Sequence, residues 1–172
     1  RALERLPVSE PHLLLGSAVR DPEPRVRAGA ALVLGKVGDA QAVPLLLELL
    51  SDAEASVRAE AARALGLLHA EEAVRRLMEA FHDYDAQVQV AAARALGQIG
   101  SPVCLETLVR GLENASEELG SAIAWSLGRI AWDDPERLID VLFQGNDRSS
   151  RIGTLGALAQ MGHASGRELI RS

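Results

Sequence analysis

Apolar residues recur along the chain at spacings of three and four, which is the period of an α-helix and not the alternation of a β-strand. Residues 41–69 show the pattern clearly. An apolar stretch is interrupted by the polar pair Ser51 and Asp52, and a second apolar series follows. This stretch predicts two helices, at about 41–50 and 55–68.

Three residues in this stretch agree with the two predicted helices. Pro44 suits a first helical turn, because the N–H group that proline lacks has no helical acceptor there. Asp52 and Ser56 are candidate caps of the second helix, since a short polar side chain can accept a hydrogen bond from a free N–H group at a helix start.

The pair of helices recurs every 31 residues without insertion or deletion. Glycine keeps this interval through four copies, at Gly35, Gly66, Gly97 and Gly128. We predict first helices at about 10–19, 41–50, 71–81, 102–113 and 134–143. Second helices are predicted at about 24–37, 55–68, 86–99, 117–130 and 148–161.

One such helical hairpin cannot bury its own apolar faces, so the units must stack into a solenoid. The prediction is an all-α fold with a single domain over residues 1–172. Its units are expected at about 10–38, 39–69, 70–100, 101–131 and 132–162, with a partial sixth unit at 163–172. The recurrent glycines predict a close approach of neighbouring helices or a left-handed helix end.

The repeated residues resemble a known family. The copy that carries the resemblance is Asp52-x-x-x-x-Val57-Arg58-x-x-Ala61-Ala62-x-Ala64-Leu65-Gly66, and the copy from Asp21 to Leu46 is similar. The chain resembles the short HEAT-like repeat of the phycobilisome-lyase type over about 10–170. The resemblance implies a right-handed α-α superhelix in which second helices line the concave face. It also implies a protein-binding scaffold, since fewer members are chromophore lyase subunits, relatives of DNA-repair glycosylases or di-iron hydroxylases.

Composition agrees with a helical, globular protein. Hydrophobic residues make up 48% and charged residues 24%, which excludes a disordered chain. Aromatics make up only 3%, against 28 Ala and 27 Leu, which favours helices over sheets. No apolar run is long enough to span a membrane. A single cysteine, Cys104, and the lack of a secretory signal lead us to expect a cytoplasmic protein. The opening at Arg1 and the partial last unit suggest a piece of a longer chain or complex.

No set of residues for catalysis, a cofactor or a metal emerges from the sequence. The four histidines include no His-Glu pair of the kind that a di-iron hydroxylase of this repeat class would repeat. His69 and His163 occupy equivalent turns, and we expect them to be polar turn residues. Cys104 has no second cysteine to pair with and is expected to be a buried thiol. We therefore expect no enzymatic activity in this chain and no bound cofactor.

Charge separates the two sets of helices. The net charge is −6, yet the second helices carry nine basic and three acidic residues. If the second helices line the concave face, as the resemblance implies, an acidic protein has a relatively basic inner surface. We expect Arg27 and Arg58 to be exceptions that bond the aspartate of the neighbouring turn as a structural ladder.

Helical geometry separates the columns of the repeat. Val26, Ala30, Leu34 and Val37 are expected to face the core. Three columns vary freely and are expected to face the groove: Leu32, Arg63, Arg94, Trp125 and Gly156; Gly29, Glu60, Ala91, Ala122 and Gly153; and Lys36, Leu67, Gln98, Arg129 and Gln160. From these columns we predict a protein-binding site of Leu32, Lys36, Glu60, Arg63, Arg94, Gln98, Trp125 and Arg129, with Trp125 as the anchor.

The function predicted from these columns is a non-enzymatic scaffold that binds an acidic protein or peptide segment. The alternative is an accessory subunit of an enzyme that handles a bilin or another tetrapyrrole, whose propionates would suit Arg63 and Arg94. DNA binding ranks third, because the net charge of −6 works against nucleic acid.

Overall fold

The structure is a computed structural model that describes residues 11–131, so the predicted fifth unit and partial sixth unit lie outside it. The α-helices are α1 (Pro11–Leu15), α2 (Pro24–Val37), α3 (Val43–Leu49), α4 (Ala55–Leu67), α5 (Val74–Ala80), α6 (Ala86–Ile99), α7 (Leu105–Gly111) and α8 (Glu117–Ala131). Single 3₁₀ turns are η1 (Ala18–Arg20), η2 (Ala40–Ala42), η3 (Glu71–Ala73), η4 (Pro102–Cys104) and η5 (Leu112–Asn114).

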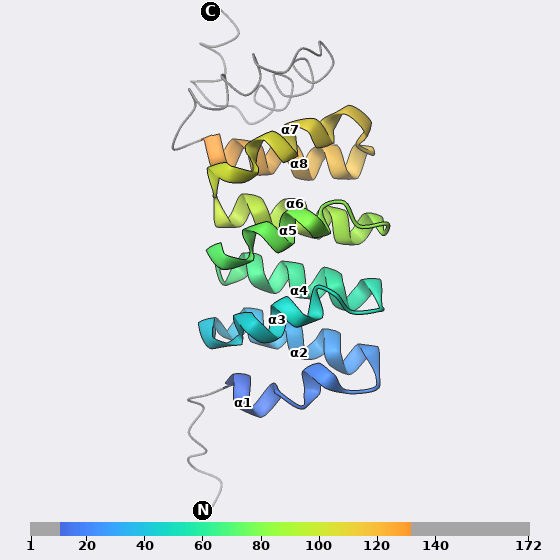
Figure 1. The fold of residues 1–172 in the computed structure, drawn as a ribbon, viewed down its shortest axis with the longest axis vertical. Helices are drawn as coiled ribbons and strands as arrows, with labels where there is room; N and C mark the ends of the chain where they lie inside the picture. The colour runs from blue at the N-terminus through green and yellow to red at the C-terminus, as the bar shows by residue number, and fades with distance from the viewer. Residues whose placement is uncertain (1–10, 132–172) are drawn as a thin grey trace, which may run out of the picture.

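The helical hairpins stack along the long axis of the molecule, so the predicted all-α solenoid is confirmed (Figure 1). Each second helix packs against the second helix of the next unit, in the order α2, α4, α6 and α8. Each first helix packs against the second helix of its own unit. The predicted ranges agree with the second helices to within a residue at either end.

The first helices are shorter than predicted, because a 3₁₀ turn precedes α3, α5 and α7. Pro44 lies in the first turn of α3, as its missing N–H group predicts. The expected caps of α4 are wrong. Its N-cap is Glu54, which makes no side-chain bond, whereas Asp52 accepts a 2.9 Å hydrogen bond from the N–H group of Glu54 and so closes the preceding turn.

Glycine makes the contact between successive second helices possible. A Cβ on Gly35 would lie 2.7 Å from Cα of Ala64. A Cβ on Gly66 would lie 2.8 Å from Cα of Ala95, and one on Gly97 would lie 2.6 Å from Cα of Ser126. Close approach is therefore the reason for the recurrent glycine. The left-handed helix ends fall three residues later, at Gly38 (φ 80°), His69 (φ 48°) and Gly100 (φ 80°).

The core repeats with the same period. Completely buried leucines recur on the second helices at Leu34, Leu65, Leu96 and Leu127, and on the first helices at Leu46, Leu77 and Leu108. Full burial of one such side chain contributes roughly 1.5–3 kcal/mol to folding. Because each leucine is enclosed by helices of its own and adjacent units, this apolar layer is continuous through the stack.

Two residues assigned to the core are exposed. Val26 is 41% exposed and Val37 is 52% exposed, whereas Ala30 and Leu34 are buried as predicted. Val57 and Val88, which occupy the position of Val26 in the next two units, are completely buried. The difference arises from neighbours, because α4 and α6 each lie between two second helices, while α2 has only α4 beside it in the described part of the chain.

The predicted arginine ladder is confirmed in two successive turns. Arg27 binds both carboxylate oxygens of Asp52 at 2.6 and 2.8 Å, and Arg58 binds those of Asp83 at 2.8 and 2.9 Å. Each guanidinium also donates to two backbone carbonyls of its own turn, Arg58 to those of Asp52 and Ala53. Each rung therefore ties the start of one second helix to the next unit.

Candidate protein-binding face

One column of side chains on the second helices is released from packing. We call it the open column, and its described members are Leu32 on α2, Arg63 on α4, Arg94 on α6 and Trp125 on α8. All of them are exposed, Trp125 at 40%. The residues that follow them directly in α4, α6 and α8 are the buried Ala64, Ala95 and Ser126. A shift of one residue thus separates a free position from a tightly packed one.

Trp125 and Arg129 form the most ordered part of this face. Cζ of Arg129 lies 5.2 Å from the centroid of the Trp125 ring, a cation–π arrangement one helical turn apart. Nε of Arg129 also donates a 3.2 Å hydrogen bond to the carbonyl oxygen of Gly97 on α6. The guanidinium is therefore held in place while the indole stays exposed, so both groups are preorganised for contact.

Glu60 and Arg63 compensate each other on α4. Nη1 of Arg63 lies 2.6 Å from Oε1 of Glu60, and the arginine side chain is 46% exposed. An exposed pair of this kind contributes at most about 1 kcal/mol to stability. Arg63 can therefore exchange Glu60 for a carboxylate of another molecule at little cost in folding energy.

A further column, formed by Lys36, Leu67, Gln98 and Arg129, extends this face toward the C-terminal ends of the second helices. Lys36 is exposed, Gln98 is half-buried, and Leu67, which follows the same period, is 47% exposed. The backbone carbonyl of Gln98 lies 2.8 Å from Nδ1 of His69, so this histidine ties the end of α4 to α6 as a turn residue. Sequence reasoning left Leu67 out of the site, although its column was recognised.

The column of Gly29, Glu60, Ala91 and Ala122 was expected to face the groove, and the structure contradicts this for part of it. Glu60 is half-buried, but Ala91 and Ala122 are completely covered and do not face a groove. Ala91 lies one helical turn before Ala95, on the side of α6 that meets Gly66 of α4. The small side chain of Ala91 is buried between the helices, whereas the longer side chain of Glu60 is partly exposed.

The chemically reactive side chains outside this face have structural roles. Cys104 is buried, as expected, and burial raises the pKa of its thiol to about 11, which keeps it protonated and unreactive at neutral pH. Nδ1 of His12 lies 2.7 Å from a carboxylate oxygen of Asp39, and the hydrogen bond lowers the pKa of that carboxyl group.

Between residues 11 and 131, no three His, Cys, Asp or Glu side chains gather as a metal site. None of the described helices has the length and hydropathy that a membrane crossing requires.

The family is decided by the repeats themselves. The family of HEAT repeats matches residues 12–86 and 74–152. This chain belongs to the HEAT repeat family. A comparison with curated protein sequences found no match.

Solved structures agree with this HEAT repeat fold. The complex of CpcE and CpcF of phycocyanin lyase from Nostoc sp. PCC7120 is similar at a TM-score of 0.69 with 23% identity, over 98% of this chain and 73% of that one. An engineered protein is similar at a TM-score of 0.61 with 24% identity, over 85% of this chain and 77% of the other. A designed armadillo repeat protein is similar at 0.60 with 18% identity, over 92% and 86%. At identities under 25%, these likenesses show the fold, a solenoid of stacked helical repeats.

Proposed function

We propose that this HEAT repeat protein is a non-enzymatic scaffold that binds an acidic protein segment along its second helices. Arg63 and Arg94 would attract the acidic side chains, and Trp125 with Arg129 would supply the anchor. The observation that carries the proposal is the open column, whose members stay exposed while the residues that follow them in α4, α6 and α8 are buried. No fold requirement explains two arginines and a tryptophan at these positions.

Physical chemistry supports this choice of partner. Tryptophan, tyrosine and arginine side chains are enriched among the few residues that carry most of the binding energy of a protein interface. Basic groups on an overall acidic protein favour a partner of opposite charge and orient its approach. The structural likeness to CpcE and CpcF, which form a complex with each other, is consistent with a protein partner.

The experiment is a selection of displayed peptides on the full chain, followed by calorimetry of the selected peptides. We expect acidic sequences, and the double substitution W125A/R94E should weaken them by about tenfold or more. The control is V103A/R75E, which truncates an exposed apolar side chain in η4 and reverses an exposed charge on α5, away from the second helices. The proposal is wrong if the selected peptides lack an acidic excess or bind both variants equally well.

A second candidate function is an accessory subunit that handles a tetrapyrrole, and it rests on the likeness to the phycocyanin lyase structure. Arg63 and Arg94 would then hold the propionates of the pigment. Titration of haem or a bilin into the protein tests this candidate directly. It requires a shifted absorbance band that disappears in the variant R63E/R94E, and an unchanged spectrum would exclude it.

A further inference from the structure

The members of the open column lie at one repeat position on successive second helices. Leu32, Arg63, Arg94 and Trp125 follow one another at the 31-residue period, so each step along the column leads from one second helix to the next. The helices α2, α4, α6 and α8 lie side by side in this order along the stack (Figure 1). A segment that contacts the whole column therefore runs across the second helices and not along one of them.

The glycine contacts set the length of each step. A Cβ on Gly35 would lie 2.7 Å from Cα of Ala64 on the next second helix, which means that the two backbones touch. Packed helix axes are ordinarily about 8–10 Å apart, and contacts through glycine belong to the lower part of this range. Three such steps lead from Leu32 to Trp125, so the column is roughly 24–30 Å long.

Backbone conformations differ in how well they repeat their side chains at this distance. A polyproline II helix has three residues per turn and a rise of about 3.1 Å, so every third side chain lies on one face at intervals of about 9.3 Å. Side chains on one face of a β-strand are about 6.6 Å apart, which is too short for one step and too long for half of it. In an α-helix, the seventh residue returns to the same face after about 10.5 Å, which adds up to about 32 Å over three steps. The polyproline II helix covers three steps in about 28 Å and fits the column best.

The aromatic end of the column favours the same conformation. Trp125 is 40% exposed, and Arg129, held by its bond to the carbonyl of Gly97, lies beside the indole ring. Exposed aromatic rings are the surfaces on which proline-rich polyproline II segments dock, because such segments are preformed and lose little conformational freedom on binding. Leu32 is 38% exposed and offers an apolar contact at the other end.

The two arginines can satisfy both the side chains and the backbone of such a segment. A polyproline II helix makes no internal hydrogen bonds, so its carbonyl oxygens are free acceptors. Each guanidinium has five N–H donors. Arg63 uses Nη1 for Glu60, and the exposed Arg94 forms no ion pair within residues 11–131. Donors therefore remain for a carboxylate and a backbone carbonyl at each of the two central positions.

We propose, on the basis of the scaffold function above, that the open column binds a polyproline II segment of about ten residues, in which an apolar residue, two acidic residues and a second apolar residue stand at every third position. The acidic residues pair with Arg63 and Arg94, and the apolar residues cover Leu32 and Trp125. The intervening residues point away from the protein and suit proline.

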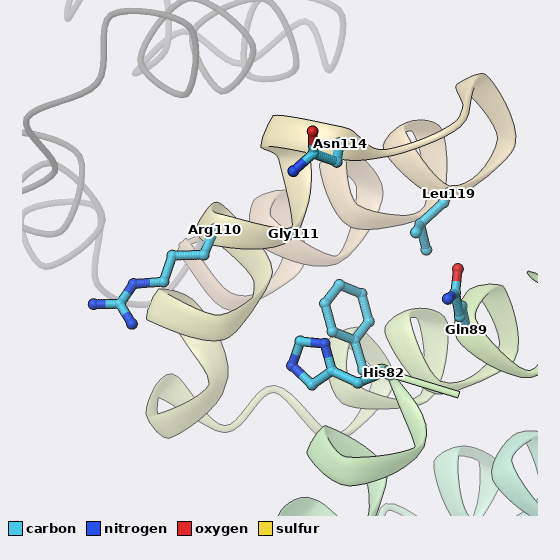
Figure 2. A pocket seen from close by; sticks show the side chains of 7 residues that line it. His82, Gln89, Arg110, Gly111, Asn114 and Leu119 are labelled. Atoms are coloured by element: carbon cyan, nitrogen blue, oxygen red, sulfur yellow. The ribbon is translucent and has the colours of Figure 1, made fainter. Parts of the chain in front are cut away.

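A pocket of about 290 Å³ between the third and fourth units is a rival site for an acidic segment, because Arg110 is part of its lining. Figure 2 shows the Arg110 side chain extending away from Gln89 and Asn114. The pocket contains no residue of the open column, and Arg110 forms an ion pair with Glu106 at 2.6 Å. R110E is therefore the matched control for R94E, since both substitutions reverse the charge of an exposed arginine.

The test compares three peptides, each titrated into the full chain by calorimetry. Ac-LPPEPPEPPL-NH2 has the proposed spacing, and Ac-LPPPEPEPPL-NH2 has the same composition with its glutamates two residues apart. A helical peptide built on alanine and glutamine places the same leucines and glutamates seven residues apart. We expect the first peptide to bind at least about tenfold more tightly than either of the others. Equal binding of all three, or no binding of the first peptide up to about 1 mM, would overturn the polyproline II assignment.

The two charge-reversal variants locate the bound segment. R94E should weaken the binding of Ac-LPPEPPEPPL-NH2 by about tenfold, whereas R110E should leave it unchanged. Binding that is lost equally in both variants, or in neither, contradicts a segment on the open column. Failure of the scaffold function gives a different result, because the displayed peptides would then show no acidic excess at any spacing. Acidic peptides that are selected, but bind without regard to spacing, leave the scaffold function standing and refute only the polyproline II segment.

Discussion

Arg58 and Arg63 lie five residues apart on α4, yet they differ in exposure and in the groups that they bind. The Arg58 side chain is 6% exposed and joins two carboxylate oxygens and two backbone carbonyls across a unit boundary. The Arg63 side chain is 46% exposed and forms an ion pair with Glu60 of its own helix. The difference teaches that residue type alone does not mark a binding face. An arginine is available for a partner where the repeat geometry leaves its guanidinium exposed and with fewer internal acceptors than a ladder arginine has.

The largest effect is expected from breaking the ladder. R58L should lower the free energy of unfolding by about 3 kcal/mol, because it leaves the carboxylate of Asp83 without its cation and two carbonyls without a donor at a buried site. R63A on the same helix is the control and should cost less than about 0.5 kcal/mol. Urea denaturation of both variants measures the difference. Similar losses would mean that the two arginines are energetically equivalent.

A smaller loss is expected at the contact between second helices. G66A forces a Cβ against the backbone of Ala95 and should cost about 1–3 kcal/mol. G29A is the matched control, because a Cβ there meets nothing within 4 Å and the substitution should raise stability by about 0.5–1 kcal/mol. Thermal unfolding checks both, and a stabilised G66A would refute the close approach.

Acid should weaken the ladder before it affects the open column. Hydrogen bonds from Arg27 lower the pKa of Asp52, and although burial works in the opposite direction at Asp83, the bonds from Arg58 lower the pKa of that carboxyl as well. A lowered pKa in the folded state means that the stabilisation is present above the ordinary carboxyl pKa of about 4 and is lost as the pH falls below it.

The measurement is the free energy of unfolding between pH 5 and pH 2. The parent should lose stability steeply over this range, whereas D52N should start lower and show a shallower slope. An identical slope in the two proteins would show that the rung carboxylates do not titrate with folding.

The smallest effect is expected from extending the arginine ladder by one rung. Gln89 occupies the position of Arg27 and Arg58, and Asn114 occupies that of Asp52 and Asp83. The double substitution Q89R/N114D gives the third turn the residues of the first two and should raise stability by about 1 kcal/mol, since charged hydrogen bonds replace a single neutral one. Either substitution alone should change stability less than the pair does. A double-mutant cycle by urea denaturation measures this coupling, and additive effects would argue against a restored rung.

Much of the fold follows from local pattern. The positions of α2, α4, α6 and α8 are set by apolar spacing, by the 31-residue period and by where glycine fits. The ladder of Arg27 and Arg58 also follows from sequence, because an arginine and an aspartate recur in phase. The open column was predicted from its variation and is exposed, but variation alone does not decide exposure, because the second column varies as well and its Ala91 and Ala122 are covered.

The sequence by itself determined the helical hairpin, its period and the stacking that buries one leucine per helix, because these depend on side chains repeated in every unit. Only the tertiary structure decided which equivalent residues are covered. Val26 and Val57 share a slot but differ in exposure, since burial depends on the helix next door. Ala91 and Glu60 also share a slot, but the length of the side chain decides which of them reaches water.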